Sequence, residues 1–290
     1  MAVTTADIKQ LREMTGAGIL DCKKALNESG GDVEQAVEYL RRKGLAAAAK
    51  KTSREANDGL VAAAVSEDGQ IGALVEINCE TDFVARTEDF KNFVSSITRQ
   101  VLAQEINSVD TLLGAPFIDN PGNTVADQVT ETIAKLGENI QVRQLARFVR
   151  QGPGLIDSYI HPGGRVGVLV EVGGGEANKA QLGQLVHDLA LHIAAASPRY
   201  LDESDVPAEA LAAEQDIFRA QLANENKPDN IKERIVEGKI KKWYGEVTLV
   251  NQEFVKDPDL TISKLLEKAG KEIGDQISIR RFARFELGAS

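Results

Sequence analysis

The residues of this chain that could carry out covalent chemistry are two cysteines and three histidines. Cys22 and Cys79 have no Cys or His at the spacing of a metal site, so neither a disulfide framework nor a zinc centre is indicated. A thiol hydrolase would use one of these cysteines as its nucleophile, beside a histidine distant in the sequence. Glu80 and Asp82 follow Cys79 and would raise the pKa of its thiol. The thiol hydrolase therefore remains an alternative, which these acidic neighbours disfavour.

The three histidines all lie in the second half of the chain. His187 and His192 are five positions apart and do not share a helix face as a zinc pair would, which favours structural roles for both. His161 begins a His-Pro-Gly-Gly turn, where partner contact and simple exposure are both open interpretations. The sequence contains no Walker loop, no Gly-x-Ser-x-Gly elbow and no paired cysteines. We therefore expect no enzymatic activity, no cofactor and no metal, and we favour a protein that acts on another protein.

One aromatic residue, Phe83, stands out in the segment from Val75 to Arg86. The apolar run 71–77 predicts a buried strand, and apolar residues at helical spacing follow from Phe90 onward. Thr81-Asp82-Phe83 therefore lies on the connection between a strand and a helix. Two interpretations remain open, because Phe83 either folds back to plug the core or points outward toward a partner.

The overall charge narrows the range of partners. A formal net charge of −10 argues against a general affinity for nucleic acid or an anionic membrane, since both need clustered cations. Residues 1–55 carry ten Lys and Arg against eight Asp and Glu, so a mildly basic beginning precedes an acidic remainder. No apolar run reaches the length of a membrane span, and no signal pattern opens the chain. These features predict a cytoplasmic protein with a protein partner.

The first part of the chain predicts a small helical bundle. Thr4 with Asp7 and Asp32 with Gln35 form plausible capping pairs, and apolar residues at helical spacing follow each pair. A middle helix begins after Gly16-Ala17-Gly18, which favours a tight turn over a phosphate-binding loop because no strand precedes it. Residues 44–58 lose apolar periodicity and predict a linker with a helical first half. We therefore predict a helical domain over residues 1–54, suited to docking.

The middle of the chain is duplicated. Two predicted hairpins are displaced by 95 positions, the helices that follow them by 92, and a closing strand in each copy by 137. The first copy carries three extra residues between strand and helix, within the segment that contains Thr81-Asp82-Phe83. These patterns predict an α+β fold in which two related halves with antiparallel sheets occupy residues 55–150 and 151–290.

The second copy contains an insertion at about residues 200–245. About 80 residues separate Ala196 from Ile277, against about 38 between the corresponding positions of the first copy. Residues 207–223 and 231–244 read as helices joined by a Lys-Pro-Asp-Asn turn, which predicts a projecting helical hairpin. Homodimerisation through this hairpin, contact with a partner, and a solvated ornament all remain open.

The residues assembled so far resemble the bacterial-type elongation factor Ts family, which exchanges nucleotide on elongation factor Tu. The resemblance covers nearly the whole chain and is carried by five segments. They are Thr15-Gly-Ala-Gly-Ile-Leu-Asp-Cys-Lys-Lys-Ala-Leu26, Asn78-Cys-Glu-Thr-Asp-Phe-Val84, Gly137-Glu-Asn-Ile140, Arg165-Val-Gly-Val-Leu-Val170 and His192-Ile-Ala-Ala-Ala-Ser-Pro198. It implies a ubiquitin-associated-like head, a duplicated α+β core and a helical hairpin inserted in the second core half.

The resemblance also implies a function and a set of contact residues. It implies that the chain binds elongation factor Tu, both GDP-bound and nucleotide-free, and promotes GDP release by disturbing the magnesium and phosphate region of Tu. The residues 81–84, Thr81, Asp82, Phe83 and Val84, would form the segment that reaches the magnesium region. The implied partner-binding residues are Lys9, Arg12, Ile19, Leu20, Lys23, Asp82, Phe83, Leu136, Gly137, His161 and Val255.

Overall fold

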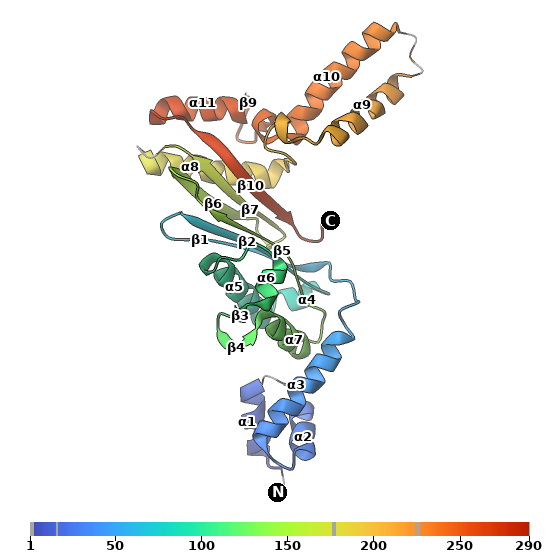
Figure 1. The fold of residues 1–290 in the computed structure, drawn as a ribbon, viewed down its shortest axis with the longest axis vertical. Helices are drawn as coiled ribbons and strands as arrows, with labels where there is room; N and C mark the ends of the chain where they lie inside the picture. Colours follow the sequence, from blue (N-terminus) through green and yellow to red (C-terminus); the bar gives the residue numbers. More distant parts are fainter. Residues whose placement is uncertain (1–2, 16, 176–177, 224, 226, 290) are drawn as a thin grey trace.

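The computed structural model describes residues 3–15, 17–175, 178–223, 225 and 227–289. Its parts follow one another along a long axis (Figure 1). A three-helix head lies at one end, two antiparallel sheets with helices on their outer faces form the middle, and a helical hairpin projects at the other end. The predicted α+β class, with its N-terminal bundle, is confirmed.

The head has its own small apolar core. Its helices are α1 (Thr5–Thr15), α2 (Ile19–Glu28) and α3 (Val33–Ala49). The side chain of Asp32 accepts a hydrogen bond from the backbone N–H of Gln35 at 3.0 Å and caps α3, as the sequence predicts. The helices pack around the buried residues Leu11, Cys22, Ala25, Leu26 and Ala36. Gly16, part of the predicted tight turn, lies outside the described residues.

Helix α3 continues beyond the head and contacts α7 (Val125–Leu136) in the first core half. Arg41 lies 3.6 Å from Asp127, and a Cβ built at Gly44 would lie 3.0 Å from the Cβ of Ala134. Ala48 is buried within the apolar core of the first half. The helical first half of the expected linker is therefore packed onto the core, and the division near residue 54 stays a prediction.

Two three-stranded sheets pack face to face. The first has the order β1-β2-β5 and the second the order β10-β7-β6, with all neighbours antiparallel. The strands are β1 (Asp58–Val65), β2 (Ile71–Cys79), β5 (Gln141–Val149), β6 (Gly154–Ile160), β7 (Val166–Gly173) and β10 (Ser278–Glu286). Helix α5 (Glu88–Ala103) covers the outer face of the first sheet, and α8 (Lys179–Ala196) covers that of the second. The central strands β2 and β7 are therefore buried along nearly their whole length.

Close approach of the sheets depends on paired glycines. A Cβ at Gly72 would lie 2.6 Å from Leu169 Cδ1, and one at Gly167 would lie 2.5 Å from Val61 Cγ1. A pair of buried carboxylates, also 95 positions apart, each accepts from the backbone just beyond the closing strand of the other half. Glu171 accepts from the Gln151 N–H at 2.6 Å, and Glu76 accepts from the Gly288 N–H at 3.1 Å. The two halves thus form one core with approximate twofold symmetry.

The duplication extends further than the sequence patterns indicated. A short strand pair and a helix recur at a displacement of 137, namely β3 (Pro116–Phe117), β4 (Asn120–Thr124) and α7 against β8 (Glu253–Phe254), β9 (Asp257–Thr261) and α11 (Ile262–Ile273). In the first half, α6 (Val109–Gly114) packs against α7 and β5. The second half instead carries the 3-10 turns Glu203–Asp205 and Leu249–Asn251 and the inserted hairpin.

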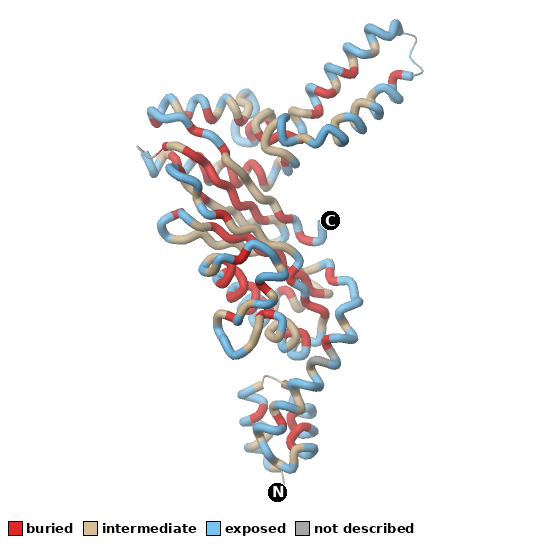
Figure 2. The backbone as a smooth tube through the Cα atoms, in the orientation of Figure 1, coloured by how far each residue is buried: buried red, intermediate tan, exposed pale blue. Residues whose placement is uncertain are grey.

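The inserted hairpin consists of α9 (Ala208–Leu222) and α10 (Asp229–Val247). Its helices pack on each other through the buried residues Leu222, Val236 and Ile240. Most of the remaining surface is exposed, as Figure 2 shows for the arm that projects from the body. The predicted helical hairpin is confirmed, and α10 begins two residues earlier and ends three residues later than the pattern suggested.

Candidate functional site

Phe83 points into solvent. It lies on a single helical turn, α4 (Asp82–Ala85), which interrupts the expected connection, and it is 80% exposed. The interpretation of Phe83 as a core plug is therefore wrong. The neighbours of Phe83 are anchored, because Ala85 is buried and Val84 packs against the core of the first half. The ring is therefore held out in solvent by a turn whose neighbouring residues pack into the core.

A carboxylate from a distant part of the sequence holds the beginning of this turn. Glu138 Oε2 accepts from the backbone N–H groups of Glu80 and Thr81 at 3.1 and 3.0 Å, and its Oε1 accepts from the Thr81 hydroxyl at 2.6 Å. In return, the Glu80 side chain accepts a hydrogen bond from the backbone N–H of Asn139 at 2.7 Å. The Thr81 hydroxyl oxygen also accepts from the Val84 N–H at 3.4 Å and caps α4. The direction of Phe83 is thus set by contacts between residues 80–84 and 138–139.

Leu136 and Gly137 lie immediately before this carboxylate, at the end of α7. Gly137 adopts a left-handed conformation with φ of 82°, which ends the helix and turns the chain toward Glu80. Leu136 packs partly buried against the core of the first half. The structure therefore brings together two of the implied contact segments, residues 81–84 and residues 136–137.

Sequence reasoning missed the role of Glu138. Glu138 has a counterpart in the second half, because Asp275, 137 positions later, accepts from the Gly175 N–H at 2.7 Å. Gly175 in turn corresponds to Glu80 at the displacement of 95. The duplicated acceptor was a signal in the sequence, and comparing the two copies position by position would have found it.

The implied contact residues of the head are all exposed. Ile19 is 55% and Leu20 is 82% exposed, and Lys9, Arg12 and Lys23 are exposed as well. Met14, which the sequence reasoning did not select, adds a third exposed apolar side chain, at 60%. Helices α1 and α2, which carry these residues, pack against each other. The head therefore exposes three apolar and three basic side chains on two helices that pack together.

The remaining implied contacts lie in the second half, apart from Phe83. His161 is exposed after β6, where its Nδ1 lies 3.2 Å from the Tyr159 hydroxyl. Val255 is 44% exposed at the turn between β8 and β9. In Figure 1 β9 lies beyond the second sheet from α4 and α7, whereas β6 is a strand of that sheet. The implied contact residues are thus spread along the molecule instead of gathering in one cleft.

The structure gives little support to the thiol hydrolase. Burial raises the pKa of Cys79 to about 12, with nearby Glu138 adding to the rise. Cys22 is buried in the head and lies 3.5 Å from the Ala17 carbonyl oxygen. His187 is paired with Asp157 at 3.1 Å, and His192 is fully buried. Because a thiolate is the nucleophile in such enzymes, the raised pKa counts directly against this alternative.

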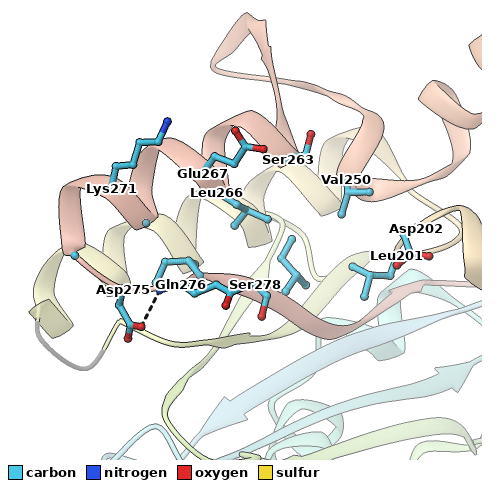
Figure 3. Close-up of a pocket in the computed structure, with 14 residues that line it drawn as sticks. Leu201, Asp202, Val250, Ser263, Leu266, Glu267, Lys271, Asp275, Gln276 and Ser278 are labelled. Atoms are coloured by element: carbon cyan, nitrogen blue, oxygen red, sulfur yellow. Dashed lines mark hydrogen bonds between the residues drawn. The ribbon is translucent and has the colours of Figure 1, made fainter.

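An open groove of about 910 Å³ lies between α11 and the beginning of β10. Figure 3 shows Ser263, Glu267 and Lys271 on α11, and Gln276 and Ser278 where the chain passes from this helix into β10. Its lining contains no histidine or cysteine, so it lacks both residue types that a thiol hydrolase would need. Across the described residues, no group of three or more potential ligands could hold a metal ion, and no helix has the length and hydropathy to cross a membrane.

Comparison with known proteins gives consistent similarities. The family profile described as Elongation factor TS matches residues 80–289. Elongation factor Ts of Clostridium perfringens (strain SM101 / Type A) is 50% identical over 286 residues, covering 99% of this chain and 93% of that protein. Elongation factor Ts of Trichlorobacter lovleyi is 46% identical over 291 residues, with the same coverage of both chains. The similarity therefore extends over the helical head, both sheets and the inserted hairpin.

Proposed function

Since this chain belongs to the elongation factor Ts family, we propose that it binds elongation factor Tu carrying GDP and promotes the exchange of GDP for GTP. The observation that carries the proposal is the 80% exposure of Phe83 on a turn held by Glu138. In this proposal the chain acts as an exchange factor and not as an enzyme, without a cofactor, in the cytoplasm, and without direct contact to nucleic acid or membrane.

The mechanism follows from differential affinity. An exchange factor must bind nucleotide-free Tu more tightly than Tu with nucleotide, because equal affinity for both states would shift nothing. An exposed aromatic can supply this difference if it gains buried area only when the magnesium and phosphate loops of Tu move apart. Because the turn that carries the ring is already held before binding, less backbone entropy is lost on association. Asp82 is paired with Arg86 at 2.8 Å, so it would present negative charge to Tu only where this pair opens.

The other contact residues serve to hold Tu while this ring acts. The exposed apolar and basic residues of the head, Leu136 with Gly137, and the second-half residues His161 and Val255 would contact separate regions of Tu. Their spacing along the molecule suits a partner of several domains. The hairpin stays outside this minimal set, and homodimerisation through it is a separate proposal, to be tested by sedimentation of the chain alone.

The test is the release of fluorescent GDP from elongation factor Tu. Tu loaded with the labelled nucleotide is mixed in a stopped-flow instrument with this protein and an excess of unlabelled GDP. We expect the rate of fluorescence loss to rise with the concentration of this protein and to saturate. A release rate that stays at the spontaneous value at all concentrations would contradict the proposed function.

A further inference from the structure

A buried histidine in the second half holds the turn that carries Val255. His192 on α8 is fully buried, and its ring lies 6.0 Å from that of Phe254. The backbone N–H of Val255 donates to His192 Nδ1 at 3.3 Å. His192 Nε2 lies 3.0 Å from Gln252 Oε1. The ring therefore bridges the turn between β8 and β9 and the chain just before it.

These contacts determine which ring nitrogen carries the proton. Nδ1 accepts from an N–H and so is unprotonated, which leaves Nε2 to donate to Gln252 Oε1. The Gln252 amide then donates from Nε2 to the carbonyl oxygens of Glu246 at 2.7 Å and Ala196 at 3.2 Å. Every polar atom of the two side chains has a partner. Burial lowers the pKa of His192, although the Gln252 bond opposes this, and the neutral ring agrees with the geometry.

The first half makes the same contact with a different residue. Gln100 corresponds to His192 at the helix displacement of 92, and Ile118 corresponds to Val255 at the displacement of 137. The Ile118 N–H donates to Gln100 Oε1 at 3.0 Å, and Gln100 is fully buried as well. An acceptor from the long helix thus holds the tip of the short strand pair in both copies. A glutamine at this position performs in one half what the histidine performs in the other.

We propose that neutral His192 is a positioning residue, which holds the Val255 turn in the conformation that contacts elongation factor Tu. The proposal rests on the proposed function, since Val255 must meet Tu for its position to matter. Through Gln252 the same network reaches Glu246, near the end of α10. The base of the inserted hairpin therefore supports the Val255 turn, although the rest of the hairpin lies away from it.

The test compares substitutions at position 192 with one at Val255 in the full chain. His192→Phe keeps an aromatic ring but removes the acceptor, and His192→Gln restores an acceptor as the first half does. Val255→Ala removes two methyl groups, and because Val255 is 44% exposed in the free protein, that part of their surface could still be buried on binding. We therefore expect Val255→Ala to bind nucleotide-free Tu about threefold more weakly. We expect His192→Phe to weaken binding by about the same factor and His192→Gln to stay near the parent. Combining His192→Phe with Val255→Ala should add little.

Two further measurements separate positioning from a general structural effect. Nitrogen NMR of the free protein should show His192 with an unprotonated Nδ1, and hydrogen exchange of the Val255 amide should accelerate in His192→Phe but not in His192→Gln. If His192→Phe does not fold, His192→Asn takes its place, because its shorter side chain places the acceptor out of reach.

Different outcomes would overturn different statements. Unchanged binding in His192→Phe, with weakened binding in Val255→Ala, would refute the positioning role of His192. Equal loss in His192→Phe and His192→Gln would refute the acceptor argument. Unchanged binding in Val255→Ala would remove Val255 from the contact surface and overturn this inference with it. Exchange through Phe83 would be untouched by that result.

Discussion

Replacing Phe83 with alanine tests the central step of the proposed exchange. Full burial of a Phe side chain contributes roughly 1.5–3 kcal/mol. Because Phe83 is already 80% exposed in the free protein, about four-fifths of this free energy, roughly 1.2–2.4 kcal/mol, is still available on binding. At about 1.4 kcal/mol per tenfold, Phe83→Ala should slow stimulated GDP release by about 7- to 50-fold.

The same exposure predicts that the variant folds normally. A side chain that is largely in water contributes little to the free energy of unfolding, so the stability of Phe83→Ala should stay within about 0.5 kcal/mol of the parent. Stopped-flow release of fluorescent GDP gives the rate, and thermal melting gives the stability. Val149→Ala is a suitable control, because Val149 is 49% exposed and lies outside the proposed contacts. A Phe83→Ala protein that exchanges nucleotide at the parental rate would refute the role given to this ring.

Four other changes test separate parts of the reasoning. Glu138→Ala removes three hydrogen bonds to the turn before Phe83, so it should slow GDP release and accelerate amide hydrogen exchange in residues 80–81. Adding Glu138→Ala to Phe83→Ala should slow GDP release little further. Deleting residues 1–43 should weaken Tu binding and leave cooperative melting of the core, because the head has its own apolar cluster. Replacing residues 215–240 with a short turn should preserve exchange, because the part removed packs mainly on itself. Glu171→Gln should flatten the loss of stability in acid. Burial alone would raise the Glu171 pKa, but the Gln151 N–H and two arginines lower it overall. The ionised carboxylate therefore stabilises the folded protein above the pKa of the unfolded chain, about 4.5, and this stabilisation is lost as the pH falls below that value.

Each of these predictions has a control or an opposing outcome. Asp275→Ala removes the equivalent acceptor in the second half and should leave the release rate unchanged. Non-cooperative melting after deletion of the head would mean that the two parts fold as one unit. Loss of exchange in a folded protein with a shortened hairpin would assign the hairpin a direct contact. Denaturant titrations from pH 7 to pH 3 give the free energy of unfolding at each pH. If it falls as steeply in Glu171→Gln as in the parent, protonation of the Glu171 carboxylate does not cause the loss of stability in acid.

The parts of the fold predicted from sequence are those with a local pattern. The apolar run 71–77 predicted β2, helical spacing from Phe90 predicted α5, and Asp32 predicted the start of α3. The displacement of 95 predicted the two related hairpins. The strand, helix and capping signals lie within short windows, where alternation and capping leave a direct trace in the residue types, and the hairpins were related by comparing two such windows.

The direction of Phe83 could not be predicted in this way. A connection of a few residues has no periodicity, so its residue types fitted a core plug as well as an exposed ring. The deciding contacts join Thr81 to Glu138, 57 positions later. The support of Val255 by His192 is similarly long-range, across 63 positions. Contacts of this kind are made by the tertiary fold, and only the comparison of the two copies carries a trace of them in the sequence.

That comparison also explains how one fold supports two different surfaces. In both halves a carboxylate after the helix C-cap, Glu138 or Asp275, accepts from the backbone just beyond the central strand. The second half needs only the shorter Asp275 to reach the Gly175 N–H. In the first half Glu138 is longer by one methylene and bonds both Glu80 and Thr81, and the three extra residues lie in the segment that forms α4. The exposed ring is therefore carried by a turn whose anchoring contact has an equivalent in the second half.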